Sequence, residues 1–200
     1  MRQAHWRKTF LVTALLCASG PSLAQQAASD AAPQAPPQAA PELAPTDVKN
    51  FGDWVVRCFP IKSLAPCDMF QMTTDKATQR RIVSTSIAYA PSLSGYVAKI
   101  VVPLGVQIAA GVTVTSDKYK SRALEYARCE NDGCYVEGPL DTALIGKLTN
   151  GKSADITITS PSGSYVALPL SLRGFSDAAA AMKALAIQRS QATAPLNAGK

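Results

Sequence analysis

Histidine is almost absent from this sequence. The single histidine, His5, and one of the five cysteines, Cys17, lie within the first 24 residues. If those residues are removed on export, no imidazole remains, which excludes Ser-His-Asp and Cys-His catalytic sites and histidine-ligated metals. No Ser-x-x-Lys sequence occurs either. We therefore expect that the protein is not an enzyme and that it uses no cofactor and no metal.

A long hydrophobic run is also missing. Residues 9–18 are apolar, but this run is about half of the ~20 residues that a membrane-spanning helix needs. Arg2, Arg7 and Lys8 precede it, and Ser22-Leu23-Ala24 has the small-x-small pattern of a cleavage site. These features predict a signal peptide over residues 1–24 and an exported protein, located in the periplasm, associated with the outer membrane, or secreted.

The sequence carries only a small excess of positive charge. The formal net charge is +6, and removal of the signal peptide leaves 17 basic and 14 acidic residues, or +3. A nucleic-acid-binding protein would have a more basic face, and export argues against such a partner. The most basic local run contains Lys118, Tyr119, Lys120 and Arg122. We take it as a candidate partner-binding patch for an anionic group, with a solvated hairpin end as the alternative.

Four cysteines remain after the signal peptide: Cys58, Cys67, Cys129 and Cys134. Cysteine pairs persist as disulfides in the oxidising compartments that exported proteins reach. Four cysteines allow three connectivities. The turn-forming run Asn131-Asp132-Gly133 makes Cys129 and Cys134 cross-strand neighbours in a hairpin, and Cys58 and Cys67 flank a proline-containing loop. Local geometry therefore favours these two short-range pairs over the crossed pairings.

The alternative is an envelope enzyme or a thiol-redox factor that uses Cys129 and Cys134. Redox-active cysteines have thiol pKa values that nearby positive charges lower, often within a Cys-x-x-Cys sequence. Here the spacing differs, and Glu130 and Asp132 would raise the thiol pKa. Structural disulfides are therefore favoured.

The mature chain divides into three parts by composition. Residues 25–48 are rich in Ala, Pro and Gln and predict a disordered linker, which would space a folded domain from a membrane or wall and allow peripheral membrane association. Residues 189–200 predict a flexible tail. Residues 49–188 are long enough for one domain with a hydrophobic core.

Short strands dominate the expected domain. Residues 81–90 alternate apolar with small polar side chains, and we also expect strands over residues 96–102, 106–108, 154–159 and 165–172. Turn signals between them indicate an antiparallel sandwich or barrel. Two helices are expected, one over residues 141–148 and one of about 13 residues with Ser176 as its N-cap.

Five ordered blocks resemble the invasion-associated locus B family. They are Phe51-Gly52-Asp53-Trp54-x-x-x-Cys58, Pro66-Cys67-x-Met69-x-Gln71, Val102-Pro103-Leu104-Gly105-Val106, Cys129-x4-Cys134 and Leu170-Ser171-Leu172-x-Gly174-Phe175-Ser176-x-Ala178. The resemblance spans residues 51–185. It implies a mainly β fold, an antiparallel immunoglobulin-like β-sandwich with one or two short helices and disulfide bonds, in an exported protein of Gram-negative bacteria.

The resemblance supplies no catalytic residues that could be carried over to this chain. The founding members of the family are linked to entry of a pathogen into red blood cells, and the family has no agreed catalytic residues. We therefore expect a non-catalytic envelope protein that binds a protein or glycan partner, in the envelope or on a host cell, and contributes to host-cell invasion or envelope integrity.

Each block also has a structural interpretation. Trp54 is expected to be a core residue beside a disulfide, and Met69 and Gln71 are expected to face opposite sides of a strand. The Pro103-Leu104-Gly105 run should end or bend a strand, and Gly174-Phe175 should seat the last helix.

Overall fold

The computed structural model describes residues 43–192. The expected signal peptide, residues 25–42 of the expected linker and the last eight residues of the expected tail lie outside these residues. The first strand begins at Asp47 and the last helix ends at Ala192. The domain boundaries at residues 49 and 188 stay a prediction; just outside them, Asp47 and Arg189 form an ion pair.

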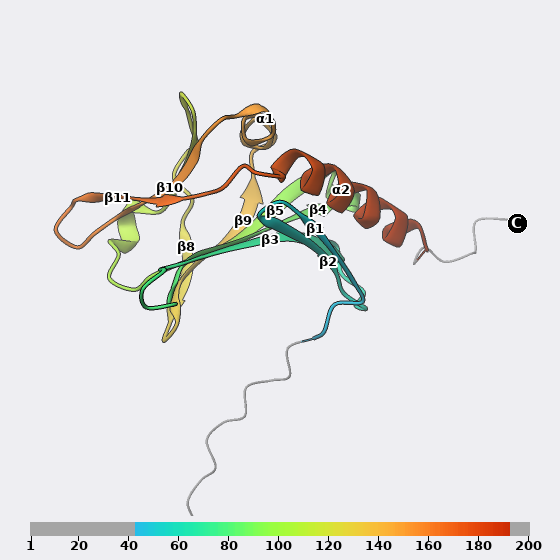
Figure 1. Cartoon of the computed structure of the whole chain (residues 1–200), viewed down its shortest axis with the longest axis horizontal. Coiled ribbons are helices and arrows are strands. Elements are labelled where there is room, and N and C mark those ends of the chain that lie inside the picture. The colour runs from blue at the N-terminus through green and yellow to red at the C-terminus, as the bar shows by residue number, and fades with distance from the viewer. Residues whose placement is uncertain (1–42, 193–200) are drawn as a thin grey trace, which may run out of the picture. The chain divides into compact units, whose positions relative to one another are not determined.

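The larger sheet within residues 43–192 has seven strands in the order β1-β2-β3-β4-β5-β9-β8, and neighbouring strands are antiparallel (Figure 1). Its strands are β1 (Asp47–Phe51), β2 (Trp54–Cys58), β3 (Cys67–Thr74), β4 (Arg81–Ala90), β5 (Gly95–Val102), β8 (Tyr126–Glu130) and β9 (Gly133–Leu140).

The smaller sheet has four antiparallel strands, again counted over residues 43–192, in the order β11-β10-β6-β7. The remaining elements include two α-helices and two short 3-10 helices. These elements are β6 (Thr113–Ser116), β7 (Tyr119–Lys120), β10 (Ala154–Thr159), β11 (Tyr165–Pro169), α1 (Thr142–Asn150), α2 (Phe175–Ala192), η1 (Pro91–Leu93) and η2 (Ile108–Ala110). The structure confirms the expected fold class: mainly β, with two antiparallel sheets, short helices and disulfides.

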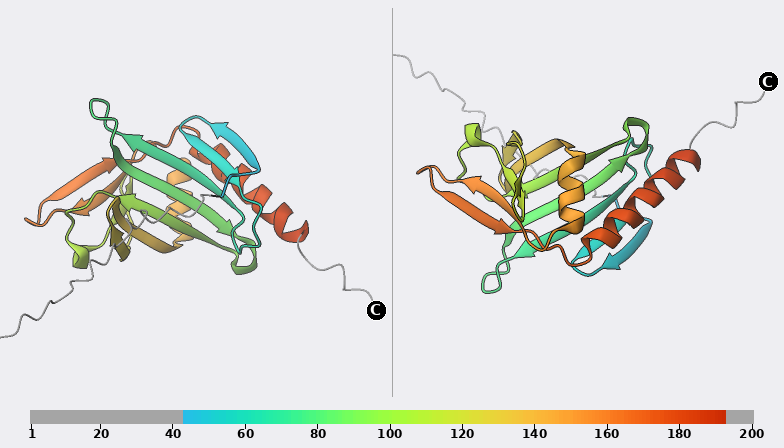
Figure 2. Two further views of the ribbon diagram at one scale, coloured as in Figure 1. Left: turned by 90° about the horizontal axis from the view of Figure 1, so that it is seen from below. Right: turned by 90° about the horizontal axis from the view of Figure 1, so that it is seen from above.

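Both α-helices lie on the same face of the larger sheet, and the β10–β11 hairpin extends beyond its edge (Figures 1 and 2). Helix α2 packs on β1 to β4 and against α1. One continuous core joins the layers, with Ile100 from the larger sheet, Ile156 from the smaller sheet and Leu144 from α1 all buried. The opposite face of the larger sheet is not covered by these helices.

Local sequence accounts for most of these elements. The alternation over Arg81–Ala90 forms β4, and α1 begins after Asp141, whose carboxylate accepts the Ala143 N–H at 2.9 Å as an N-cap. The expected strand over residues 106–108 is wrong. The chain instead leaves the sheet at Pro103, adopts φ +81° at Gly105 and makes the η2 turn on its way to the smaller sheet.

Helix α2 differs from its expected form at both ends. It begins at Phe175, so Ser176 is inside the helix and is not its N-cap. The carbonyl of Gly174, a residue with φ +83°, accepts the Ala178 N–H at 3.0 Å. The helix has 18 residues rather than about 13, because alanines and other good helix formers continue its sequence and Arg189 pairs with Asp47.

A contact network around Ser171 joins α2 to the larger sheet. The Ser171 carbonyl accepts the Trp54 indole N–H at 2.8 Å and the Gln71 amide N–H at 3.2 Å, while the Ser171 N–H donates to Gln71 Oε1 at 2.9 Å. The Ser171 hydroxyl donates to Asp53 at 2.6 Å, and Arg173 pairs with the same carboxylate. We call Asp53, Trp54, Gln71, Ser171 and Arg173 the Ser171 network.

The buried part of this network corrects one expectation and confirms another. Trp54 is fully buried, beside the Phe175 ring at 5.2 Å in an edge-to-face contact, so it is a core residue as expected. Met69 and Gln71 face the same side of β3, because residues two apart on a strand share a face, and both are buried. Gln71 is buried because its amide has backbone partners in the Ser171 network.

Two glycines let the chain segments of this network approach closely. A Cβ on Gly174 would lie 2.1 Å from the Phe51 carbonyl oxygen, and a Cβ on Gly52 would lie 2.5 Å from that of Arg173. Both residues have positive φ, +83° and +59°. The β1–β2 turn and the segment before α2 are thus in direct backbone contact, and the Asp53 N–H donates to the Arg173 carbonyl at 3.0 Å.

We predict that Gly174→Ala lowers the free energy of unfolding by about 3 kcal/mol, through left-handed backbone strain and overlap with Phe51. Gly163→Ala is the matched control, since Gly163 has φ +86° and open space where a Cβ would lie. It should lose only about 1 kcal/mol. Urea denaturation of both variants measures the difference, and equal losses would show that the contact with Phe51 is unimportant.

We also predict that Gln71→Met lowers the free energy of unfolding by about 2 kcal/mol, because the Ser171 N–H loses its acceptor in a partly buried position. Gln107→Met, at an exposed glutamine, should change stability by less than about 0.5 kcal/mol. The same urea titration serves for both. A Gln71→Met protein as stable as the wild type would contradict the importance of the Ser171 network.

Candidate binding groove

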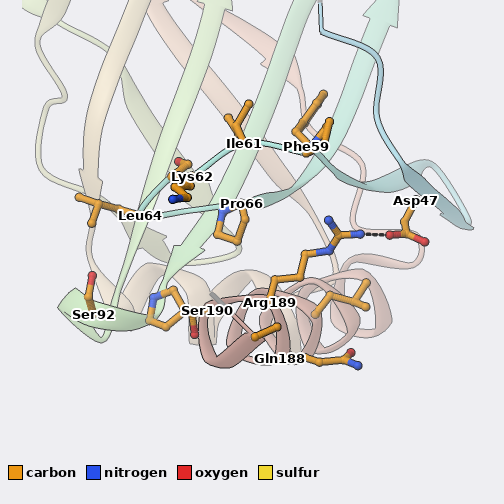
Figure 3. Close-up of a pocket in the computed structure, with 15 residues that line it drawn as sticks. Asp47, Phe59, Ile61, Lys62, Leu64, Pro66, Ser92, Gln188, Arg189 and Ser190 are labelled. Atoms are coloured by element: carbon orange, nitrogen blue, oxygen red, sulfur yellow. Dashed lines mark hydrogen bonds and ion pairs between the residues drawn. The ribbon is translucent and has the colours of Figure 1, made fainter. Parts of the chain in front are cut away.

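A groove of about 740 Å³ lies between the Cys58–Cys67 loop, the turn η1 and the C-terminal part of α2. Figure 3 shows the loop residues along one side and Gln188, Arg189 and Ser190 of α2 along the other. Its volume is within the range of ligand pockets in proteins. We call it the loop groove. Its lining residues are Asp47, Phe59, Pro60, Ile61, Lys62, Ser63, Leu64, Pro66, Pro91, Ser92, Leu185, Gln188, Arg189, Ser190 and Ala192.

The loop wall of the groove is held in shape by covalent and backbone constraints. Cys58 and Cys67 form a disulfide between paired positions of β2 and β3, and the Phe59 N–H donates to the Pro66 carbonyl at 3.0 Å. Pro60 and Pro66 fix the backbone φ at the two ends of the loop. The wall therefore exists before any partner binds, which lowers the entropy lost on binding.

Apolar side chains in this wall are exposed to solvent. Leu64 is 64% exposed and Ile61 is 47% exposed, which is high for large aliphatic residues. The side chain of Lys62 lies between them and makes no ion pair with any residue from 43 to 192. Across the groove, Arg189 pairs with Asp47 and its guanidinium donates to the Thr46 hydroxyl at 3.1 Å. The groove thus combines an apolar surface with a lone cation.

Backbone donors along the wall are also available to a ligand. The N–H groups of Ile61, Lys62, Ser63 and Leu64 make no hydrogen bond within the described part of the chain. In the same loop, the Ala65 N–H donates to the Ser63 hydroxyl at 3.2 Å, and the Phe59 N–H donates to the Pro66 carbonyl. An extended ligand with carbonyl acceptors could pair with this edge, as peptides do at exposed backbone edges.

The patch expected from the sequence does not form one site. Lys118 and Tyr119 line an open hollow beside α1, whereas Arg122 lines a different one, with Pro139 and Leu140. Lys120 lies with its ammonium 6.0 Å from the centre of the Tyr165 ring. The patch divides because Lys118 lies in the turn before the two-residue strand β7 and Arg122 lies in the segment after it, and these two segments line different hollows.

Tyr119 has a structural partner. Its hydroxyl donates to Asp141 Oδ2 at 3.0 Å. The hydrogen bond to Asp141 raises the Tyr119 pKa. The Asp141 pKa is lowered, first by the Ala143 N–H and then by the Tyr119 hydroxyl. The proton of the Tyr119 hydroxyl is therefore engaged by Asp141.

Both disulfides join the cysteines that the local sequence pairs: Cys58 with Cys67 and Cys129 with Cys134. The second bond links the two strands of the β8–β9 hairpin at paired positions. Cys134 is buried and Cys129 is exposed. No group of three or more His, Cys, Asp or Glu side chains among residues 43–192 is placed to hold a metal ion.

This geometry defines a disulfide-bonded, mainly β domain whose larger hollows open at the surface. A family model described as the invasion associated locus B protein matches residues 54–183, well over half of the chain. The chain therefore belongs to the invasion associated locus B family, which confirms the resemblance seen in its sequence blocks.

Two curated relatives support this assignment. Both are described as invasion protein B homologues, from Brucella abortus strain 2308 and from Brucella abortus biovar 1 strain 9-941. Each is 27% identical over 140 residues, which cover 68% of this chain and 79% of the relative. The crystal structure of invasion associated protein B from Bartonella henselae has the same fold, with a TM-score of 0.62 and 23% identity over 70% of this chain and 98% of that one.

One further observation concerns membranes. Over residues 43–192, neither helix is both long and apolar enough to cross a bilayer.

The loop groove was not predicted from the sequence, although one signal was present. Ile61 and Leu64 are large aliphatic residues in a short loop between two cysteines, where polar residues are usual. The second wall, from Leu185 to Ala192, lies more than 100 residues away along the chain and was expected to be partly tail. Only the folded structure brings the two walls together.

We predict that the two disulfides stabilise the domain unequally. Cys58→Ala/Cys67→Ala should lower the free energy of unfolding by about 3 kcal/mol or more, since it frees a nine-residue span and leaves a gap in the core, and Cys129→Ala/Cys134→Ala by about 2 kcal/mol. Urea denaturation of non-reduced protein gives both values. In the native wild type, iodoacetamide should alkylate none of the four cysteines. Alkylation of Cys129 or Cys134 would contradict a structural disulfide and favour the thiol-redox alternative.

Proposed function

We propose that this protein is a non-catalytic, exported protein of the cell envelope that binds a protein partner through the loop groove. The partner belongs to the envelope or to a host cell. The names of the relatives, invasion protein B homologues, support a contribution to host-cell invasion, and a contribution to envelope integrity is the other outcome of such binding. Residues 1–24 serve as the export signal in this proposal.

The loop groove is the observation that carries the proposal. It offers exposed Ile61 and Leu64, the unpaired cation of Lys62 and a row of backbone N–H donors on one preformed wall. A polypeptide segment supplies matching groups: apolar side chains, carbonyl acceptors and a carboxylate for Lys62. The proposed occupant is therefore a partner segment that is apolar and carries at least one Asp or Glu.

Site-specific crosslinking tests this assignment. A photoreactive benzoylphenylalanine replaces Gln188, which is exposed on the helix wall of the groove, and the protein is irradiated in its native envelope. We expect a crosslink to a polypeptide segment of the stated composition. Adding Ile61→Glu and Leu64→Glu on the opposite wall should reduce that crosslink at least five-fold, because two charges would be placed in the apolar contact.

The control places the same photoreactive residue at Met72, an exposed position on the uncovered face of the larger sheet. Its crosslinks should not respond to the two substitutions. A Gln188 crosslink to lipid, to glycan or to a second copy of this chain would overturn the proposal. So would a crosslink that survives Ile61→Glu/Leu64→Glu, or the absence of any crosslink at Gln188.

A further inference from the structure

The β6–β7 hairpin contacts α1, and three lysines line the surface where the two meet. Lys118 is in the hairpin turn, Lys147 is in the last turn of α1, and Lys152 follows that helix. They line an open hollow of about 750 Å³, together with Ser116, Asp117, Tyr119, Ala143, Gly146 and Asn150. We call it the lysine hollow. It is a separate surface from the loop groove, and the two have no lining residue in common.

Three contacts hold the hairpin along the length of the helix. At the start of α1, the Tyr119 hydroxyl donates to Asp141 at 3.0 Å. Near its end, the Ser116 hydroxyl donates to the Lys147 carbonyl at 3.0 Å. Beyond its end, the Asp117 carboxylate accepts the Lys152 and Ser153 N–H groups, each at 3.2 Å. The backbone that carries the lysines is thus held in place by these contacts.

Positive charge in the hollow is not neutralised locally. Lys118, Lys147 and Lys152 make no ion pair with any other residue between 43 and 192. The lining holds one carboxylate, Asp117, which accepts backbone N–H groups and offsets only one of the three lysine charges, while nearby Asp141 accepts hydrogen bonds from the Tyr119 hydroxyl and the Ala143 N–H. The hollow therefore has an excess of cations that suits an anionic ligand.

Two uncharged groups narrow the ligand class. The Tyr119 ring is half-buried at the wall of the hollow, and the Asn150 amide N–H donates to the Gly146 carbonyl at 2.9 Å, which leaves the Asn150 amide oxygen available. Gly146 has open space where a side chain would begin, so nothing from α1 fills the hollow there. The aromatic ring can contact a sugar ring, the amide oxygen can accept from sugar hydroxyl groups, and the neighbouring lysine ammonium groups can bind a carboxylate. Together these groups match an acidic sugar.

We infer that the lysine hollow binds an acidic glycan, with a carboxylate of the glycan between the lysine ammonium groups and a sugar ring against Tyr119. A concave site between a helix and a hairpin accepts one projecting acidic residue at a time. A layer of anionic lipid headgroups is planar and would meet the rim instead. The glycan site is independent of the protein partner proposed for the loop groove, so either can fail alone.

Isothermal titration with a hexamer of galacturonic acid, at 150 mM salt, tests this inference. We expect the full mature chain to bind the hexamer, to bind its methyl ester at least ten-fold more weakly, and not to bind neutral dextran. Lys118→Gln/Lys147→Gln/Lys152→Gln should lose at least ten-fold in affinity. The matched control, Lys49→Gln/Lys76→Gln/Lys99→Gln, removes the same charge at three exposed lysines elsewhere and should lose less than two-fold.

Two further measurements make every outcome decisive. The three lysines are replaced by arginine, which retains the charge, and binding should stay within three-fold of the wild type. Urea denaturation confirms that each variant is folded. Equal losses in the two glutamine triples, equal affinity for the methyl ester, no binding of either the galacturonate or a sulfated hexasaccharide at 1 mM, or binding only to phosphatidylglycerol vesicles would each overturn the glycan assignment.

Discussion

The carbonyl of Ser171 is the acceptor on which the architecture depends. It receives hydrogen bonds from Trp54 and Gln71, which belong to two neighbouring strands, and it lies four residues before α2. Because these donors are buried, losing them would leave polar groups without water or a partner. The Ser171 network therefore fixes where the last helix starts and, through it, where the helix wall of the loop groove lies.

Sequence reasoning succeeded where structure is set by neighbours in the chain. The β8–β9 hairpin follows from turn residues between two cysteines, β4 from its alternation, and α1 from Asp141 at its N-cap. It failed where the structure is determined by a contact between residues that are far apart in the sequence. Gln71 is buried because Ser171, 100 residues later, binds its amide, and α2 starts at Phe175 because Gly174 packs on Phe51. No local pattern contains those pairings.

The loop groove and the lysine hollow also depend on contacts between parts of the chain that are far apart in the sequence. A run of basic residues suggested one patch, but Lys118 lies in the turn before β7 and Arg122 in the segment after it, and the tertiary fold brings Lys147 and Lys152 to Lys118. The loop groove joins the Cys58–Cys67 loop and η1 to the end of α2, and the loop and the helix end are more than 100 residues apart. A surface site of this kind depends on how helices, strands and loops are placed relative to one another. No single stretch of the sequence shows that placement. The residue types could be read from the sequence, but their grouping could not.

The residues that define the family and the residues that line the loop groove are partly different. The Ser171 network lies almost entirely within the family match, residues 54–183, whereas the helix wall of the loop groove, from Leu185 to Ala192, lies beyond it. The shared region thus specifies a scaffold whose edges and hollows can differ between relatives at 27% identity. The disulfide between Cys58 and Cys67 fits this arrangement, since it holds an exposed apolar loop in one shape while leaving its side chains open to change. The fold can therefore be kept while the exposed side chains of this loop change.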